Sequence, residues 1–132
     1  MKTGIWRHLK HIKTPTFVEE VAISDTIEKI IVSILYKNSD YLNFIILENS
    51  SFLSVSGDVK NKQEFIEEII SSNYVRDLKY LSLRINIKND NLADVYYVRY
   101  ILYYNFKETF FNRKYELMKI DNQWKLKRSS PD

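Results

Sequence analysis

Residues 92–106 read Leu-Ala-Asp-Val-Tyr-Tyr-Val-Arg-Tyr-Ile-Leu-Tyr-Tyr-Asn-Phe, and this stretch decides the fold of the chain. Its β-branched and aromatic residues predict a long strand. Strand-like runs over residues 81–87 and 109–120 flank it, a short run over residues 123–128 follows, and only polar turns separate the four. Consecutive strands joined by short turns form an antiparallel meander. We therefore expect the second half of the chain to be one antiparallel sheet.

The first half of the chain carries helical patterns instead. A stripe of isoleucine and leucine side chains predicts a long helix that starts near Phe17 or Ser24 and ends at Lys37. Asp40 follows a polar break and is placed to cap a short second helix over residues 41–47. Two helices are therefore expected before the first strand.

A short strand and a third helix connect the two halves. Residues 52–55 have a strand-like pattern, and Gly57 closes it. Asn61 with Glu64 three residues later forms a capping box, which predicts the start of a helix. Helices gathered in the first half and strands in the second predict an α+β domain, with the helices laid on one face of a curved antiparallel sheet.

The composition limits the classes of protein to which the chain could belong. At 132 residues, with 45% hydrophobic and 28% charged residues, it fits one domain that buries its own core without a disulfide or metal staple. Cysteine is absent, which excludes thiol catalysis, disulfides and cysteine metal sites, and makes a cytoplasmic location the simpler expectation. No apolar run approaches the roughly 18 residues of a membrane span.

Basic residues gather at the two ends of the chain. Residues 1–14 hold four basic side chains and no acid, and more lysine and arginine follow in the last two predicted strands. Basic terminal strands are typical of solvated edges that discourage pairing with another sheet, so nucleic-acid binding is not favoured. His8 and His11 are spaced to face one metal ion, but no third ligand lies near them in the sequence. We therefore expect neither a metal site nor a cofactor.

Both faces of the predicted strand at residues 92–106 are apolar or aromatic. One face carries Ala93, Val95, Tyr97, Ile101 and Tyr103, and the other carries Leu92, Tyr96, Val98, Tyr100, Leu102 and Tyr104. A sheet with one face in water would alternate apolar with polar residues. Something must therefore cover the second face, and a second copy of the chain is the most economical candidate. The pattern predicts a homodimer formed through the sheet.

Four short motifs, in this order, match a known family. They are Asp40 at the break between the first helices, Gly-Asp-Val-Lys-Asn-Lys-Gln-Glu at residues 57–64, Asn-Leu-Ala-Asp-Val at residues 91–95, and Asp-Asn-Gln-Trp-Lys-Leu at residues 121–126. Together with the order of helices and strands, they resemble the nuclear transport factor 2-like superfamily. The resemblance is closest to small bacterial members of the ketosteroid isomerase and polyketide-cyclase-like branch.

The resemblance covers roughly residues 18–128. It implies a single nuclear transport factor 2-like domain over residues 18–132, preceded by a basic N-terminal extension over residues 1–17. The implied fold is a cystatin-like cone, in which a strongly bent antiparallel sheet wraps around the N-terminal helices and a pocket opens at the wide end. A dimer through the outer face of the sheet is also implied.

Arg99 is the most informative charged residue of the central strand. It shares a face with Tyr97 and Tyr103, and the small Ala93 beside Val95 suits the side that packs closely against helices. This phase predicts that Arg99 points into the cone. An enclosed guanidinium needs a carboxylate, a backbone carbonyl or an anionic ligand. The sequence leaves open a structural ion pair, an anion-binding pocket and a solvent-exposed strand end.

Trp124 lies in a terminal strand of about six residues, which is too short to be held by ladder bonds alone. Its indole should anchor that strand to the core or to the rim of the cone. Taken together, the candidate ligand-binding residues are Tyr97, Arg99, Tyr103 and Trp124.

The sequence supports three hypotheses for function. The leading one is a small dimeric domain that binds a small hydrophobic or amphipathic ligand in its cone pocket. The first alternative is an isomerase or cyclase-like enzyme, which the resemblance implies would use a carboxylate base in the pocket. Asp94 falls on the face opposite Arg99, so the catalytic residues stay unassigned. The second alternative is a protein-interaction module, such as an immunity-type partner of a secreted toxin.

Overall fold

The structure is a computed structural model that describes residues 15–132, so His8, His11 and most of the predicted basic extension lie outside the described residues. In chain order its elements are α2 (Pro15–Leu35), α3 (Ser39–Ile45), β1 (Ile46–Leu53), β2 (Val59–Lys60), α4 (Lys62–Ser71), β3 (Val75–Asn89), β4 (Leu92–Tyr103), β5 (Glu108–Ile120) and β6 (Gln123–Pro131). None of the helices within residues 15–132 combines the length and the apolar character needed to cross a bilayer.

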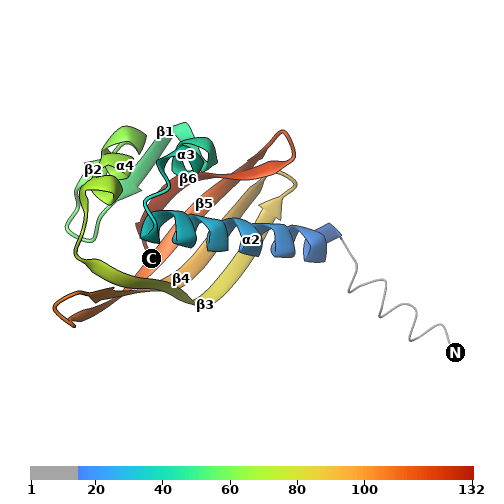
Figure 1. Cartoon of the computed structure of the whole chain (residues 1–132). Coiled ribbons are helices and arrows are strands. Elements are labelled where there is room, and N and C mark those ends of the chain that lie inside the picture. Colours follow the sequence, from blue (N-terminus) through green and yellow to red (C-terminus); the bar gives the residue numbers. More distant parts are fainter. Residues whose placement is uncertain (1–14) are drawn as a thin grey trace, which may run out of the picture.

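The strands form one mixed sheet in the order β2-β1-β6-β5-β4-β3. From β3 to β6, each strand pairs antiparallel with the next, which confirms the predicted meander. β1 instead pairs in parallel with β6. Figure 1 shows α2 crossing one face of the bent sheet, with α3 and α4 beside β1 and β2. The predicted α+β architecture is therefore confirmed.

The boundary between the second helix and the first strand differs from the prediction. α3 ends at Ile45 and β1 begins at Ile46, whereas the sequence predicted a helix over residues 41–47 and a strand only over residues 52–55. The reason is a long-range contact: Ile46 lies opposite Leu126 in the parallel pairing of β1 with β6. Pairing with β6, the last strand of the chain, extends the N-terminal end of β1 to Ile46. No local sequence pattern predicts this extension.

One of the two predicted helix caps is correct. The capping box at α4 is confirmed, because the Asn61 side chain accepts from the Glu64 N–H at 2.9 Å and the Glu64 carboxylate accepts from the Asn61 N–H at 3.0 Å. Asp40, however, does not cap α3. Asn38 does so, and its side-chain oxygen accepts from the Tyr41 N–H at 3.1 Å. Asp40 lies in the first turn, where its charge still favours the helix dipole.

β3 is longer than predicted and irregular. Its register against β4 shifts between Leu81 and Arg84, and Ser82 between them has a φ of 55°. A bulge of this kind bends its strand and increases the local twist. The bend helps the sheet to curve around α2.

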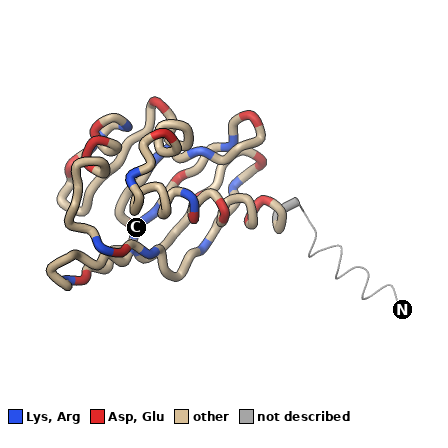
Figure 2. Tube along the Cα trace, viewed as in Figure 1, with Lys and Arg blue, Asp and Glu red and all other residues tan. Residues whose placement is uncertain are grey.

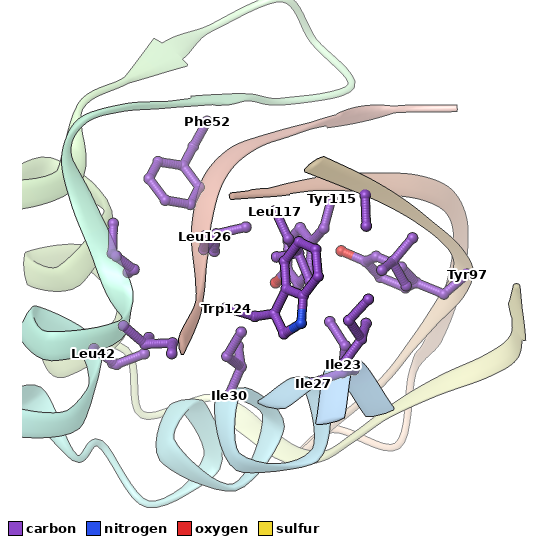
Figure 3. Close-up of a cluster of buried hydrophobic side chains, with 14 of the residues drawn as sticks. Ile23, Ile27, Ile30, Leu42, Phe52, Tyr97, Tyr115, Leu117, Trp124 and Leu126 are labelled. Atoms are coloured by element: carbon purple, nitrogen blue, oxygen red, sulfur yellow. The ribbon is translucent and has the colours of Figure 1, made fainter. Parts of the chain in front are cut away.

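The core lies between α2 and the concave face of the sheet. Ile23, Ile27 and Ile30 of α2 are almost fully buried. Figure 3 shows them facing Trp124, whose indole points from β6 toward the helix. Val95, Leu117 and Leu126 from β4, β5 and β6 belong to the same cluster. The predicted stripe on the first helix is therefore the helix side of the core.

β4 has the predicted phase. Ala93, Val95 and Tyr97 are buried in the core cluster. Asp94 lies on the opposite face of the strand, where it forms ion pairs with Lys88 at 3.3 Å and with Lys114 at 3.7 Å. The later odd-numbered positions of β4 consequently face the inside of the cone.

Candidate ligand-binding site

A cavity of about 270 Å³ opens at the end of the cone where α2 stops. Its walls come from the C-terminal end of α2, from β1 and α4, and from inward-facing positions of β3, β4 and β5. Most of the lining side chains are apolar or aromatic. The aromatic ones are Phe52, Phe65, Tyr74, Tyr80, Tyr103 and Tyr115. A concave, mostly apolar cavity with a few polar groups is the usual form of a small-molecule site.

Of the four residues that the sequence suggested, two line this cavity. Arg99 and Tyr103 project into it from alternate positions of β4. Tyr97 lies outside the lining with only 3% of its surface exposed, and its ring stacks on Tyr80, with centroids 4.1 Å apart. Trp124 is also 3% exposed and belongs to the core against α2. The structure therefore brings Arg99 and Tyr103 to the cavity, gives Tyr97 a supporting position behind it, and keeps Trp124 away from it.

Arg99 has no hydrogen-bond partner for its buried Nε within the described chain. Its guanidinium carbon lies 5.6 Å from the centroid of the Phe111 ring, which is the neighbouring residue across the β4–β5 pairing. A ring face attracts a cation but accepts no N–H bond of ordinary strength. No ion pair of Arg99 is found among residues 15–132. Of the alternatives that the sequence left open, the structural ion pair is therefore not found within the described residues.

Arg113 is a second cavity arginine, and the sequence reasoning missed it. It is 4% exposed, and its Nη2 donates to the Leu53 carbonyl and to the Ser129 hydroxyl, each at 2.8 Å. Its Nε and Nη1 make no hydrogen bond of ordinary geometry within residues 15–132, although the neighbouring Tyr97 acts to raise the pKa of the guanidinium. Burial lowers the pKa of Arg113, and the charge of Arg99 lowers it further. The guanidinium still stays charged at neutral pH.

The charged residues that line the cavity are predominantly basic. They are Lys37, Lys60, Arg99 and Arg113 against Glu68. Lys60 and Glu68 pair with each other at 2.9 Å. The charge that remains is therefore positive and includes both arginines. An anion in the cavity would meet two guanidinium groups that lack a carboxylate partner of their own within residues 15–132.

Tyrosine hydroxyls form the polar wall next to the arginines. The Tyr80 and Tyr115 hydroxyls lie 2.6 Å apart, and both residues line the cavity. Burial raises the pKa of Tyr80 and of Tyr97 well above the usual value, so both phenols stay protonated at neutral pH. In a pair of hydroxyls one donates and the other accepts, and the accepting hydroxyl keeps its own proton for a further bond. The wall can therefore offer an O–H donor to a bound oxygen.

Comparison with protein-family models and with curated proteins gave no match. Solved structures do match. An NTF2-like protein from Cytophaga hutchinsonii is 18% identical, with a TM-score of 0.77, and the match covers 84% of this chain and 94% of that one. A candidate scytalone dehydratase from Novosphingobium aromaticivorans is 17% identical, with a TM-score of 0.71 and coverage of 86% and 83%. The association domain of C. elegans CaMKII is 15% identical, with a TM-score of 0.72 and coverage of 85% and 93%.

These identities establish the fold and leave the chemistry to the site itself. The cone, its order of elements and its similarity to those structures agree with the resemblance drawn from the sequence motifs. The described chain therefore has the fold of the nuclear transport factor 2-like superfamily.

Proposed function

We propose that this protein binds a small amphipathic acid in the cavity of its cone. The observation that carries the proposal is that Arg99 and Arg113 line one cavity and both have N–H groups without acceptors within residues 15–132. Leaving a guanidinium charge unpaired in such surroundings costs several kcal/mol. An acidic ligand in the cavity would offset this cost by pairing with the half-buried Arg99. Residues 1–14 contain no Asp or Glu that could serve instead.

The apolar walls determine the rest of the ligand. Phe52 and Phe65 stack with their centroids 3.8 Å apart on the β1 and α4 side, and Leu78 and Ile101 line the β3 and β4 side. Such walls stabilise a ligand mainly through the apolar area that leaves water, at about 25 cal/mol per Å². The ligand class that combines both requirements is an acid with an apolar body.

An enzyme of the isomerase or cyclase type is the first alternative. The similarity of the fold to the candidate scytalone dehydratase supports it. It needs a carboxylate base in the cavity. Glu68 is the one carboxylate among the described residues that line the cavity, and Lys60 already pairs with it. With two arginines and a single paired carboxylate, the cavity favours the binding of an acid over proton abstraction.

A protein-interaction module is the second alternative. Figure 2 shows acidic residues in both α2 and α4, which would suit a basic partner. The open cavity nevertheless supports a ligand-binding role more directly, because a pure interaction module gains nothing from two arginines inside its cone.

We also propose that two copies pair through the outer face of the sheet. Leu81, Val98, Tyr100 and Phe110 form an apolar outer patch on adjacent strands, since Leu81 lies opposite Val98 and Tyr100 opposite Phe110. Leu81 is 38% exposed and Phe110 59%. Lys79 and Glu108 both contact Tyr100 of the patch, so charges of both signs lie beside it. This suits a two-fold contact in which each charge meets its opposite on the copy. The similarity to CaMKII association domains supports self-association of this fold.

Titration calorimetry tests the binding proposal. Hexanoate and phenylacetate should bind to the wild-type protein, and their neutral amides should bind at least about tenfold more weakly, because a charge-assisted bond to arginine is lost. Arg99→Met should remove this preference for acids. Arg76→Met, at an exposed arginine outside the cavity lining, serves as the matched control and should change nothing. Equal binding of acids and amides would refute the proposal.

A further inference from the structure

We infer that the ligand is an aryl-substituted monocarboxylic acid, with its ring between the aromatic walls and its carboxylate at Arg99; this rests on the acid-binding function proposed above. Aromatic rings line the cavity from opposite edges of the sheet. Phe52 and Phe65 belong to the β1 side, while Tyr74 and Tyr103 belong to the β3 and β4 side. A flat ring bound in the cavity therefore has aromatic surface to pack against at either wall.

The wall rings are already arranged in stacked pairs. Phe52 and Phe65 are almost parallel, with an angle of 3° between their planes, and Tyr74 and Tyr103 have centroids 5.8 Å apart at 27°. Aromatic rings attract one another in offset-stacked and edge-to-face arrangements beyond the gain from buried area alone. A saturated chain or ring of the same size lacks this additional attraction. The walls consequently favour an arene over an alkyl group.

The size of the cavity and the spacing along β4 limit the length of the ligand. About 270 Å³ accommodates one ring with a short side chain, and lies just below the range usual for larger ligands. Arg99 and Tyr103 are four residues apart on one strand, which corresponds to about 13 Å at 3.3 Å per residue. A ring centred midway along this span lies about 6 to 7 Å along the strand from the Cα of Arg99. A spacing of this order suits a short linker of one or two methylene groups between ring and carboxylate.

The polar end of the cavity fits a carboxylate better than a phosphate. Nη2 of Arg113 is already used by Leu53 and Ser129, and Nε and Nη1 of Arg113 and Nε of Arg99 are closed off from solvent. Within residues 15–132, the terminal Nη1 and Nη2 of the half-buried Arg99 are therefore the donors left for a ligand, beside the hydroxyl wall at Tyr80. Two carboxylate oxygens can accept from these groups. A phosphate dianion has three terminal oxygens and a larger charge, which call for more donors than this corner supplies.

The test is a calorimetric comparison of 3-phenylpropionate, 3-cyclohexylpropionate, heptanoate and phenyl phosphate on the full chain. We expect 3-phenylpropionate to bind about three- to tenfold more tightly than its cyclohexyl analogue and than heptanoate. Tyr103→Leu should abolish this difference while the requirement for a carboxylate persists. Tyr104→Leu, at the exposed neighbouring tyrosine outside the lining, should retain the difference.

The other outcomes separate this inference from the proposed function. If the cyclohexyl acid or heptanoate binds as tightly as the aryl acid and Arg99→Met weakens all three, the aryl inference fails and acid binding stands. If phenyl phosphate binds most tightly, the carboxylate assignment fails. If none of the acids binds to the wild-type protein, both the inference and the proposed function fail.

Discussion

Arg99 and Arg113 project into one cavity from adjacent strands, offset by two residues in the β4–β5 register. The pairing places Arg99 opposite Phe111 and Arg113 opposite Tyr97. The two guanidinium groups are therefore diagonal neighbours, and the charge of Arg99 contributes to the lowered pKa of Arg113, after burial. Like charges on neighbouring strands repel each other, and an anion bound between them would offset that repulsion.

The two arginines should differ in their effect on stability. Arg113→Met removes the bonds to Leu53 and Ser129, so it should lower the free energy of unfolding by about 2 kcal/mol or more. Arg99→Met removes a charge without an ion-pair partner in the described chain, so it should leave that free energy unchanged or raise it. Urea unfolding without ligand measures both. An equal loss in the two variants would mean that Arg99 has a structural partner.

Trp124 should matter for stability and not for ligand binding. Its indole fills the core against Ile27 and Ile30, so Trp124→Ala should cost about 3 to 5 kcal/mol of unfolding free energy. Tyr36→Ala, at a largely exposed ring, should cost no more than about 0.5 kcal/mol. Urea midpoints and slopes provide the measurement. A loss below about 1 kcal/mol at Trp124 would contradict its role as a core anchor.

Dimer formation should depend on the outer patch. Sedimentation at micromolar concentration should give a dimer for the wild-type chain, with at least about 1,200 Å² buried. Val98→Glu places a charge in the middle of the patch and should give a monomer, because an unpaired charge cannot be buried cheaply there. Val32→Glu, at a half-exposed position of α2, should remain dimeric. A monomeric wild-type protein would exclude this interface.

Stability should fall as the pH rises above about 10. Burial raises the pKa of Tyr80 and Tyr97 in the folded state, whereas in the unfolded chain these phenols titrate near the ordinary value of about 10. Above that pH the unfolded chain holds fewer protons than the folded one, so deprotonation favours unfolding. Each group should contribute a slope of up to about 1.4 kcal/mol per pH unit until its folded-state pKa is reached.

Urea titrations at several alkaline pH values test this dependence. Tyr97→Phe should make the fall of stability with pH less steep, whereas Tyr104→Phe, at an exposed ring, should leave the slope unchanged. The same slope in the wild-type protein and in Tyr97→Phe would show that the buried phenol does not govern alkaline stability.

Local sequence patterns were enough to predict the start of α4 and the side chains that β4 directs toward the cavity. Alternation along residues 92–106 predicted which side chains of β4 share a face, and the small Ala93 beside Val95 indicated that this face lies inward. Arg99 and Tyr103 belong to that face, and both line the cavity. The Asn61 and Glu64 capping box marked the start of α4. Both signals involve residues within a few positions of one another, where backbone geometry alone decides the outcome.

Tertiary structure alone decided the features that depend on distant partners. The extension of β1 back to Ile46 required pairing with β6, about 80 residues later in the chain. The inward phase of Arg113 required the register between β5 and β4, because strand periodicity relates residues to each other and does not say which face lies inside. Trp124 could have faced the cavity rim or the core, and only the packing of α2 on β6 chose the core. Register and packing depend on contacts between residues that are far apart in the sequence, so no single stretch of sequence predicts them.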